Sequence, residues 1–320
     1  MITLLTTAKP FVGITRIRQL NAIRSWKQLH PDVEILLFGD GEGYDLAAAE
    51  NDLVRIVDVP TSDRGCPRID AMFMMADKMA RYPVKAYVNC DIILMPDFLM
   101  APLNIQFKEY LIVAQRWDLT VDGEMSFERD WDLVLQQKVA KEGQLMSPYA
   151  IDVFAYRGEF WQGLPPLIVG RAGYDNFLIY YCRKQHVPVV DATALMSLVH
   201  QTHDYTHIEG GKGEVWDGSE AQMNIRNAGG RDVLLSIEDA DWRMTTDGLT
   251  RNWCRGDCRR AAEIQGMIRG YCGKGILLML LEMVYELQSR FVAFIQHQYT
   301  PLLKYPFWVM MRLGGKRSRR

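Results

Sequence analysis

Two polar side chains follow a buried apolar run in the first third of the sequence. The run ends at Val88, and Asn89 and Asp91 come directly after it, two positions apart. Ligands of open α/β sheets collect at the carboxyl ends of strands, and side chains two positions apart in an extended segment point to the same side. Their amide and carboxylate oxygens could therefore bind a divalent cation or a ribose. The alternative is that both residues only terminate the strand.

Three histidines stand close together in the second half of the chain, in Val199-His-Gln-Thr-His-Asp-Tyr-Thr-His207. We expect this segment to form a loop after a strand and a short linker. Neutral imidazole is a good ligand for divalent metals, so His200 or His203 could complete a site begun by Asp91. Phosphate oxygens and water would fill its other positions. A zinc site is the rival interpretation, but no cysteine pair stands at zinc-like spacing, and we interpret Cys254 and Cys258 as unpaired thiols.

The composition is that of a globular protein with a large core. The chain has 320 residues, of which 48% are hydrophobic and 24% charged. Its formal charge of −2 gives no reason to expect nucleic-acid binding, although the last five residues form a basic tail. Six scattered cysteines suit a reducing compartment, so a cytoplasmic location is expected. Residues 1–10 lack the basic and apolar parts of an export signal and are interpreted as the first strand.

Apolar runs alternate with segments of helical periodicity along the first ninety residues. Strands are expected at 2–6, 33–38, 54–59 and 85–89, with helices at 14–29 and 68–80. This alternation predicts an α/β fold with a doubly wound, mostly parallel sheet. The pattern then becomes mixed, with strands expected at 110–115, 151–156 and 187–191 and helices at 128–141 and 175–185.

The order of these features resembles that of the nucleotide-sugar glycosyltransferases with the GT-A fold. The resemblance rests on Thr6-Thr7, Asp40, Asn89-Cys90-Asp91, Gly173-Tyr-Asp-Asn-Phe-Leu178 and the histidine segment. In that superfamily a D-x-D element holds Mn²⁺ or Mg²⁺ on the donor diphosphate, which implies Asp91 as a metal ligand together with His200 or His203. Asn89 departs from the first Asp of the element. The resemblance covers residues 1–235 and implies a Rossmann-like catalytic domain over residues 1–245.

The donor-binding residues that we predict are Thr6, Thr7, Asp40, Arg68 and Asn89. Asp40 stands among glycines at a strand end, where it could accept a hydrogen bond from a base or a ribose or could only form a turn. Arg68 could donate to phosphate oxygens as a planar fork, and a solvated surface position is the alternative.

Asp175 is the predicted general base. It begins a helix and matches the acidic position of the acceptor-side motif of the superfamily, so it would take the proton of an acceptor hydroxyl. Asp152 is the second choice, and the alternative for it is a strand-end carboxylate that binds a backbone amide. Trp117 and Asp118 follow a strand ending at Gln115 and could bind an acceptor sugar, with core packing as the alternative for Trp117.

The C-terminal part of the chain differs in character. Residues 275–294 are almost continuously apolar but carry a polar stripe of Glu282, Glu286, Ser289 and Arg290. A membrane-spanning helix is disfavoured because three charges would lie in hydrocarbon. Aromatic residues and the basic tail follow, so residues 246–320 are predicted to form a helical extension that contacts anionic lipid at the inner face of the membrane. Packing against the catalytic domain or a second protomer is the alternative.

Together these features predict a metal-dependent glycosyltransferase that moves a sugar from a nucleotide-sugar donor to a hydroxyl acceptor. The acceptor is predicted to be a lipid-linked or cell-surface glycan precursor, an inference that rests on the C-terminal extension alone. A sugar-phosphate nucleotidyltransferase is one alternative, although Thr6-Thr-Ala-Lys-Pro10 is not the glycine-rich basic loop usual in that class. A non-catalytic nucleotide-sugar-binding protein is the other, and it is favoured if Asn89 marks a lost metal site.

Overall fold

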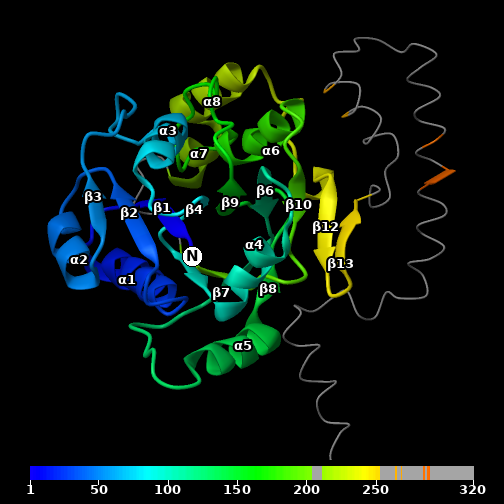
Figure 1. Cartoon of the computed structure of the whole chain (residues 1–320). Helices are drawn as coiled ribbons and strands as arrows, with labels where there is room; N and C mark the ends of the chain where they lie inside the picture. Colours follow the sequence, from blue (N-terminus) through cyan, green and yellow to red (C-terminus); the bar gives the residue numbers. More distant parts are fainter. Residues whose placement is uncertain (204–210, 253–263, 265–267, 269–283, 285–286, 289–320) are drawn as a thin grey trace, which may run out of the picture.

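A nine-stranded mixed sheet forms the centre of the molecule (Figure 1). The computed structural model describes residues 1–203 and 211–252 and five isolated positions after them, 264, 268, 284, 287 and 288. The strand order is β13-β12-β10-β6-β9-β4-β1-β2-β3. Within the described chain only β9 and β13 run against the other strands of this sheet. The strands are β1 (Thr3–Thr7), β2 (Glu34–Phe38), β3 (Val54–Ile56), β4 (Val84–Val88), β6 (Tyr110–Val113), β9 (Val153–Arg157), β10 (Val189–Asp191), β12 (Trp242–Thr245) and β13 (Gly248–Arg251).

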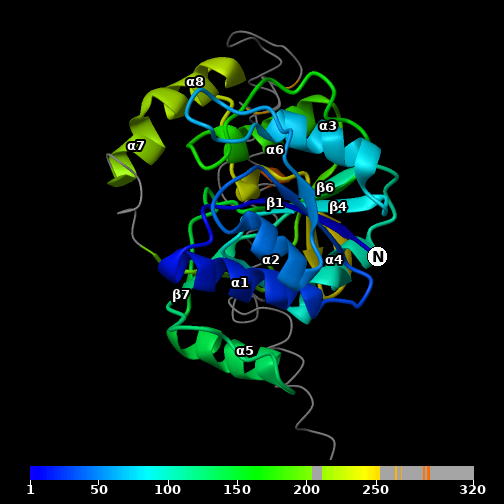
Figure 2. The ribbon, with the colours of Figure 1, turned by 90° about the vertical axis from the view of Figure 1, so that its left-hand side faces the viewer.

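Helices cover both faces of this sheet, as the two views at right angles show (Figures 1 and 2). One face carries α1 (Gly13–Lys27), α2 (Tyr44–Asn51), η1 (Pro96–Leu99) and α4 (Met100–Asn104). The other carries α3 (Ile69–Met79), α6 (Tyr174–Lys184), α7 (Gly211–Asp217), α8 (Ser219–Ala228) and η2 (Ile237–Asp239). Side chains alternate along each strand, so Leu4 packs with Trp26 on the α1 face and Leu5 with Phe73 on the α3 face. Two apolar cores result, one on each side of the sheet.

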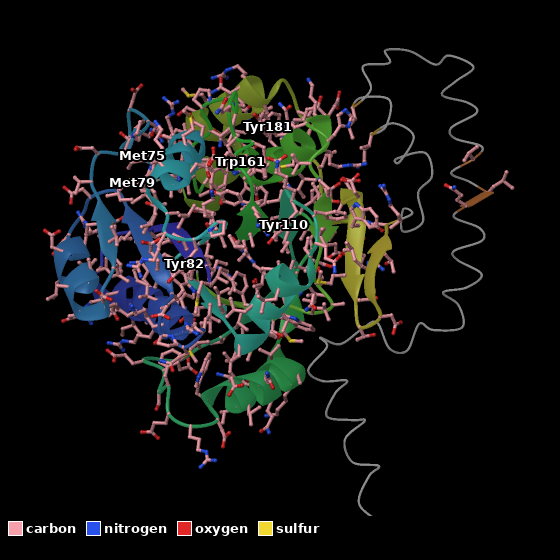
Figure 3. All side chains as sticks on the ribbon, in the orientation of Figure 1. Met75, Met79, Tyr82, Tyr110, Trp161 and Tyr181 are labelled. Atoms are coloured by element: carbon pink, nitrogen blue, oxygen red, sulfur yellow. The ribbon has the colours of Figure 1, made fainter. Side chains whose placement is uncertain are left out.

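Helix α3 illustrates why the sequence folds in this way. Its residues Ile69, Met72, Phe73 and Ala76 recur at helical spacing and are all buried against the sheet. Trp161 stacks on Phe73 with ring centroids 4.2 Å apart and on Tyr181 of α6 with centroids 6.0 Å apart. Figure 3 shows Trp161 and Tyr181 in this upper layer. The aromatic stack therefore joins α3 and α6 over one face of the sheet.

A second, four-stranded sheet with the order β5-β11-β7-β8 builds one wall of the site described below. Its strands are β5 (Ile92–Leu94), β7 (Arg116–Leu119), β8 (Gln144–Leu145) and β11 (Leu198–Gln201), and α5 (Trp131–Glu142) packs against it. His200 of β11 stands opposite Ile92 of β5 on one side and opposite Asp118 of β7 on the other. This register places residues from three distant parts of the sequence in one row.

The predicted fold class, an α/β fold with a doubly wound and mostly parallel sheet, is confirmed. The predicted strands and helices correspond to β1–β4, β6, β9, β10, α1, α3, α5 and α6. The histidine segment is not only a loop, because His200 lies within β11. Likewise Trp117 and Asp118 are not in a loop after β6 but form part of the next strand, β7. The sequence interpretation missed the small sheet, whose strands have two to four residues and too little periodicity to be recognised.

The proposed division of the chain at residue 245 stays a prediction. Strand β13 lies beyond that boundary and pairs with β12 at the edge of the main sheet. Most of the predicted extension, including the polar stripe, the pair Cys254 and Cys258 and the basic tail, lies outside the described residues. Among the helices that the structure does describe, none has the length and apolar character needed to cross a bilayer.

Candidate active site

A cavity of about 330 Å³ opens at the carboxyl ends of β1 and β4, the edge at which ligands of open α/β sheets bind. Three elements dominate its chemistry: the loop after β1, the residues that follow β4, and the N-terminal turn of α6. Its basic, acidic and histidine lining residues are Lys9, Arg18, Arg116, Arg171, Asp91, Asp152, Asp175, His200 and His203. The cavity therefore combines cations with carboxylates and imidazoles.

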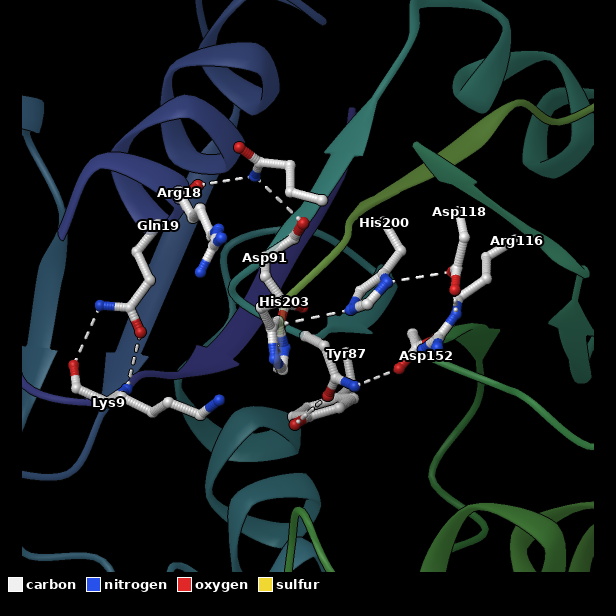
Figure 4. Close-up of polar contacts among 12 residues, drawn as sticks. Lys9, Arg18, Gln19, Tyr87, Asp91, Arg116, Asp118, Asp152, His200 and His203 are labelled. Atoms are coloured by element: carbon white, nitrogen blue, oxygen red, sulfur yellow. Dashed lines mark hydrogen bonds and ion pairs between the residues drawn. The ribbon is translucent and has the colours of Figure 1, made fainter. Parts of the chain in front are cut away.

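Asp91, His200 and His203 present three potential metal ligands to one point. One ligand atom from each lies within 4.8 Å of the other two. Nε2 of His203 is 3.2 Å and Nε2 of His200 is 3.7 Å from Oδ2 of Asp91 (Figure 4). The other Asp91 oxygen, Oδ1, is buried and has no hydrogen-bond partner among the described residues. One carboxylate and two imidazoles can bind a divalent cation, and the unused oxygen is a site that a cation would satisfy, so the residues fit a divalent metal.

The backbone fixes this geometry. Asp91 sits between the ends of β4 and β5, where its carbonyl accepts hydrogen bonds from the Gln201 backbone (3.3 Å) and the Gln201 side chain (3.1 Å). The buried Gln201 amide also donates to the Arg18 carbonyl and accepts from Asn21 of α1. A buried polar network therefore joins α1, β11 and Asp91, and it is satisfied only in this arrangement.

Asp118 orients His200. Its Oδ1 lies 3.0 Å from Nδ1 of His200 and accepts a hydrogen bond of 3.0 Å from Nε of Arg116. Burial alone would lower the pKa of His200, but the hydrogen bonds to Asp118 and Asp91 outweigh it and raise that pKa to about 9. A carboxylate on one ring nitrogen leaves the other nitrogen to face the cation site, an arrangement common around histidine ligands. Asp118 is thus engaged by His200 and Arg116, and its predicted role at the acceptor stays a prediction.

We expect Asp118→Ala to weaken Mn²⁺ binding by about 10- to 100-fold, the usual cost of losing a partner of a histidine ligand. The reason is that the His200 ring would lose the acceptor that fixes its orientation. Isothermal titration of the protein with Mn²⁺ in the absence of any donor measures the effect. Asp122→Ala, which removes an exposed carboxylate in the next turn of chain, is the matched control. Equal Mn²⁺ affinity in both variants would show that Asp118 does not position the site.

Asn89 is held by hydrogen bonds to three residues and is not among the ligands of the candidate metal site. Its Oδ1 accepts from the hydroxyl groups of Tyr87 (2.8 Å) and Tyr174 (3.3 Å), its side-chain amide donates to Asp152, and its backbone N–H donates to the Asp152 carbonyl (3.0 Å). Asp152 also accepts from Arg116. An amide can donate to a carboxylate where a second carboxylate would repel it, which explains an Asn in this position.

Asn89→Asp should therefore destabilise the protein instead of restoring a D-x-D element. Two adjacent carboxylates cannot both ionise easily, so the pair would hold a proton with a raised pKa in the folded state. The shared proton stabilises the folded variant at low pH, and this stabilisation is lost as the pH rises. The unfolding free energy of Asn89→Asp should therefore be about 1–3 kcal/mol below that of the parent at pH 8, with a smaller difference at pH 5. Urea unfolding at both pH values measures it. A variant as stable as the parent at pH 8 would contradict the assigned network.

Asp175 lies in the first turn of α6 and lines the cavity. Burial is the main cause that raises its pKa to about 7, and the nearby Asp152 adds to the rise while backbone N–H groups of Gly173, Asp175 and Asn176 oppose it. Its Oδ1 is buried and lacks a hydrogen-bond partner in the described chain. A carboxyl group that titrates near neutral pH beside a cavity can act as a general base. Asp152, by contrast, is already bound by Arg116 and Asn89.

Four of the other predicted site residues lie outside the cavity lining in the described structure. The Thr6 hydroxyl is buried and donates to the Val88 carbonyl, which joins β1 to β4. Asp40 is exposed and pairs with Arg55 at 3.0 Å, and Arg68 binds both carboxylate oxygens of Asp70. Trp117 points away from Asp118 because side chains alternate along β7, and it packs against the apolar core beneath the small sheet. Of the predicted threonines, Thr7 does line the cavity.

The sequence interpretation missed several cavity residues, namely Lys9, Arg18, Arg116, Arg171, Tyr149 and Trp216. Lys9 follows β1, and its backbone is fixed by two hydrogen bonds to the Gln19 side chain of 2.7 and 3.0 Å. Figure 4 shows Lys9 and Arg18 on one side of Asp91 and His203, with Arg116 and Asp152 on the other. Lys9 could have been predicted, because it is a basic residue in the loop directly after the first strand. The other missed residues reach the cavity only through tertiary contacts.

Comparisons with known proteins identify no family for the chain. No protein family and no curated protein matches it. Among solved structures, it is similar to glucosyl-3-phosphoglycerate synthase from Mycobacterium tuberculosis in complex with Mg²⁺ and uridine-diphosphate, with 14% identity and a TM-score of 0.45 over 72% of this chain and 80% of that chain. The same synthase with Mn²⁺, uridine-diphosphate-glucose and phosphoglyceric acid gives 14% identity and a TM-score of 0.44 over 72% and 80%.

The metal ions and uridine nucleotides in those complexes are ligands of the synthase. Similarities this distant leave the substrates of the present chain to be argued from its own residues. What the described residues define is an α/β protein whose sheet edge carries a cavity with a candidate cation site and a carboxyl group that titrates near neutral pH.

Proposed function

We propose that the chain is a metal-dependent glycosyltransferase that moves a sugar from a nucleotide-sugar donor to a hydroxyl group of an acceptor. The observation that carries this proposal is the presence, in one cavity, of the cation site of Asp91, His200 and His203 and the candidate base Asp175. Transfer of a glycosyl group needs both kinds of residue: one set to hold the departing diphosphate and one group to take the acceptor proton.

The donor diphosphate would lie between the cation site and the cationic residues of the first βα unit. A bound Mn²⁺ or Mg²⁺ would offset the negative charge that grows on the leaving diphosphate. Lys9 and Arg18 line the same cavity, and Nε of Arg18 is buried with no hydrogen-bond partner among the described residues. A donor phosphate would supply the missing acceptor, because a buried N–H without a partner is costly. These two residues were not predicted and join Thr7 as proposed donor contacts.

On the acceptor side, Asp175 would accept the proton of the attacking hydroxyl. Its raised pKa matches this task, since a base that titrates near 7 is about half ionised at neutral pH and is more basic than an ordinary carboxylate. The hydrogen-bonded group of Asn89, Asp152 and Arg116 would shape the floor of the cavity beside it. Because Asn89 has structural partners of its own, its presence is no sign of a lost metal site, and the non-catalytic alternative loses its main support.

The finer parts of the proposal concern the acceptor and the location. We propose that the enzyme is cytoplasmic and binds the inner face of the membrane through residues 246–320. Its acceptor would be a lipid-linked or cell-surface glycan precursor. The apolar and basic composition of that segment is its support. Sedimentation of the full chain with anionic liposomes, compared with a chain that ends at residue 274 and so keeps the buried Ile264, tests the membrane contact.

A thermal-shift screen tests the function itself. The protein is heated with a panel of uridine-, guanosine- and adenosine-diphosphate sugars, with Mn²⁺ and with a chelator. A donor at about 100 times its Kd stabilises the folded state by about 2.7 kcal/mol, which is a readily measured rise in Tm. We expect one class of donor to raise the Tm only when Mn²⁺ is present. If no nucleotide sugar does so, or if the chelator has no effect, the proposal is wrong.

A further inference from the structure

Two large aromatic side chains are exposed at the rim of the active-site cavity. Tyr149 is 51% exposed and Trp216 is 50% exposed, and both line the cavity. Across the described chain they are the two aromatic residues among the exposed large hydrophobic side chains. Exposed aromatic surface is unfavourable in water, and its concentration at one cavity indicates a ligand that covers it.

Both residues border the segment that carries the candidate base. The Tyr149 carbonyl accepts a hydrogen bond of 3.3 Å from the side chain of Asn176, the residue after Asp175. Trp216 follows Val215, whose carbonyl accepts a hydrogen bond of 3.0 Å from Ala172, just before α6. The backbone segments that carry the two rings are thus hydrogen-bonded to the residues around the start of α6 and not to the loop after β1, which contains Lys9. This position favours the acceptor over the base of the nucleotide.

The charges in this part of the cavity disfavour an anionic ligand. Arg171 is next to Ala172, but its Nε binds Glu220 at 2.8 Å, its Nη1 binds the Gly170 carbonyl at 3.1 Å and its Nη2 contacts Cys66 Sγ at 3.3 Å. Three of its five N–H donors are used by these partners and its charge is balanced by the buried Glu220 carboxylate, so this guanidinium adds little net positive charge for a phosphate. Aromatic faces beside occupied polar groups suit a neutral ligand with an apolar face and hydroxyl groups at its edge.

We infer that Tyr149 and Trp216 form an acceptor subsite and that the acceptor is a neutral carbohydrate whose pyranose ring lies against these aromatic faces. The inference rests on the proposed glycosyltransferase function and narrows its acceptor to a sugar hydroxyl. A pyranose presents a face of C–H groups that packs on an aromatic ring, while its hydroxyl groups remain free to reach Asp175. The two aromatic residues bind the acceptor and have no direct part in proton transfer.

Saturation-transfer NMR on the full chain tests the inference, with the methyl glycosides of glucose, galactose, mannose and N-acetylglucosamine as probes and glycerol 3-phosphate as the anionic comparison. We expect ring protons of at least one glycoside to receive saturation. Trp216→Ala and Tyr149→Ala should each weaken that binding about three- to tenfold, the range for one aromatic contact, whereas Trp216→Phe and Tyr149→Phe should retain most of it. Met74→Ala, at an exposed apolar residue of α3 outside the cavity, is the control.

Three results would overturn the inference: no glycoside binds, glycosides bind equally to the parent and the alanine variants, or glycerol 3-phosphate binds in preference. A fourth is that Trp216→Ala weakens the Mn²⁺-dependent binding of a nucleotide sugar instead, which would make this residue part of the donor site. The test separates the two proposals. Glycoside binding without any thermal shift by nucleotide sugars would contradict the glycosyltransferase proposal and support the carbohydrate site. A thermal shift by nucleotide sugars without glycoside binding would support the glycosyltransferase proposal and contradict the carbohydrate site.

Discussion

Asp91→Ala should leave the fold intact and abolish Mn²⁺-dependent binding of the donor. Asp91 supplies the single carboxylate of the three-ligand site, and both imidazoles are directed at its Oδ2. Its removal leaves two neutral ligands with no charge to hold the cation. We therefore expect Mn²⁺ affinity to fall by more than the roughly 10- to 100-fold that loss of an outer partner costs, and turnover to fall with it.

Isothermal titration with Mn²⁺, first alone and then with the donor found in the thermal-shift screen, measures this effect. Circular dichroism checks that the variant is folded. Asp45→Ala is a suitable control because that carboxylate is 95% exposed and lies on α2, away from the cavity lining. An unchanged, Mn²⁺-dependent donor affinity in Asp91→Ala would show that the metal is held elsewhere.

The main sheet could be predicted because its signals are local. The strands β1, β2 and β4 are five residues long, mostly buried and centred on apolar residues, and α3 and α6 bury residues at helical spacing. Asp91 and Asp175 could be found for the same reason, since each stands directly after a strong element boundary. Strand ends and helix starts are positions that a single sequence reveals.

His200 or His203 was predicted as the partner of Asp91, and the structure brings both to it. How the site is assembled could not be predicted, because it depends on pairing between distant segments. His200 reaches its place through the register of β11 with β5 and β7, and no local pattern encodes that register. The same pairing directs Asp118 to His200 and Trp117 to the core, so the predicted acceptor pair separates onto opposite faces of β7. Asn89 was predicted as a donor-binding residue, and its hydrogen bond to Asp152 could not be predicted because Asp152 lies 63 residues away.

Asp175→Asn should lower turnover by about 10²- to 10⁴-fold while leaving donor affinity nearly unchanged, the range for losing a general base. Asparagine keeps the volume of the side chain and removes its basicity. In the parent enzyme, turnover at saturating substrates should rise with pH and level off above the pKa of Asp175 near 7, whereas the residual rate of the variant should not follow this titration. Steady-state kinetics from pH 5 to 9 with donor titrations measure both effects.

The same substitution should stabilise the protein at alkaline pH. The unfolded carboxyl group has a pKa of 3.8, and the folded one titrates near 7, so between these values the folded state holds a proton that the unfolded state has released. The parent therefore loses stability from this group as the pH rises from about 4 to 7, a loss that an uncharged asparagine does not suffer. We expect Asp175→Asn to unfold at a higher temperature than the parent at pH 8, with a smaller difference at pH 5.

If Asp175→Asn is more stable than the parent at pH 8 but turns over normally, Asp175 affects stability and is not the general base. Asp152 was the second choice for the base, but it is bound by both Arg116 and Asn89, and proton transfer to it would break a buried ion pair. Normal turnover in Asp175→Asn would therefore favour transfer with retention of anomeric configuration, in which the enzyme need not supply a base at this position. The stereochemistry of the product, read by NMR of the freshly formed glycoside, would decide between these outcomes.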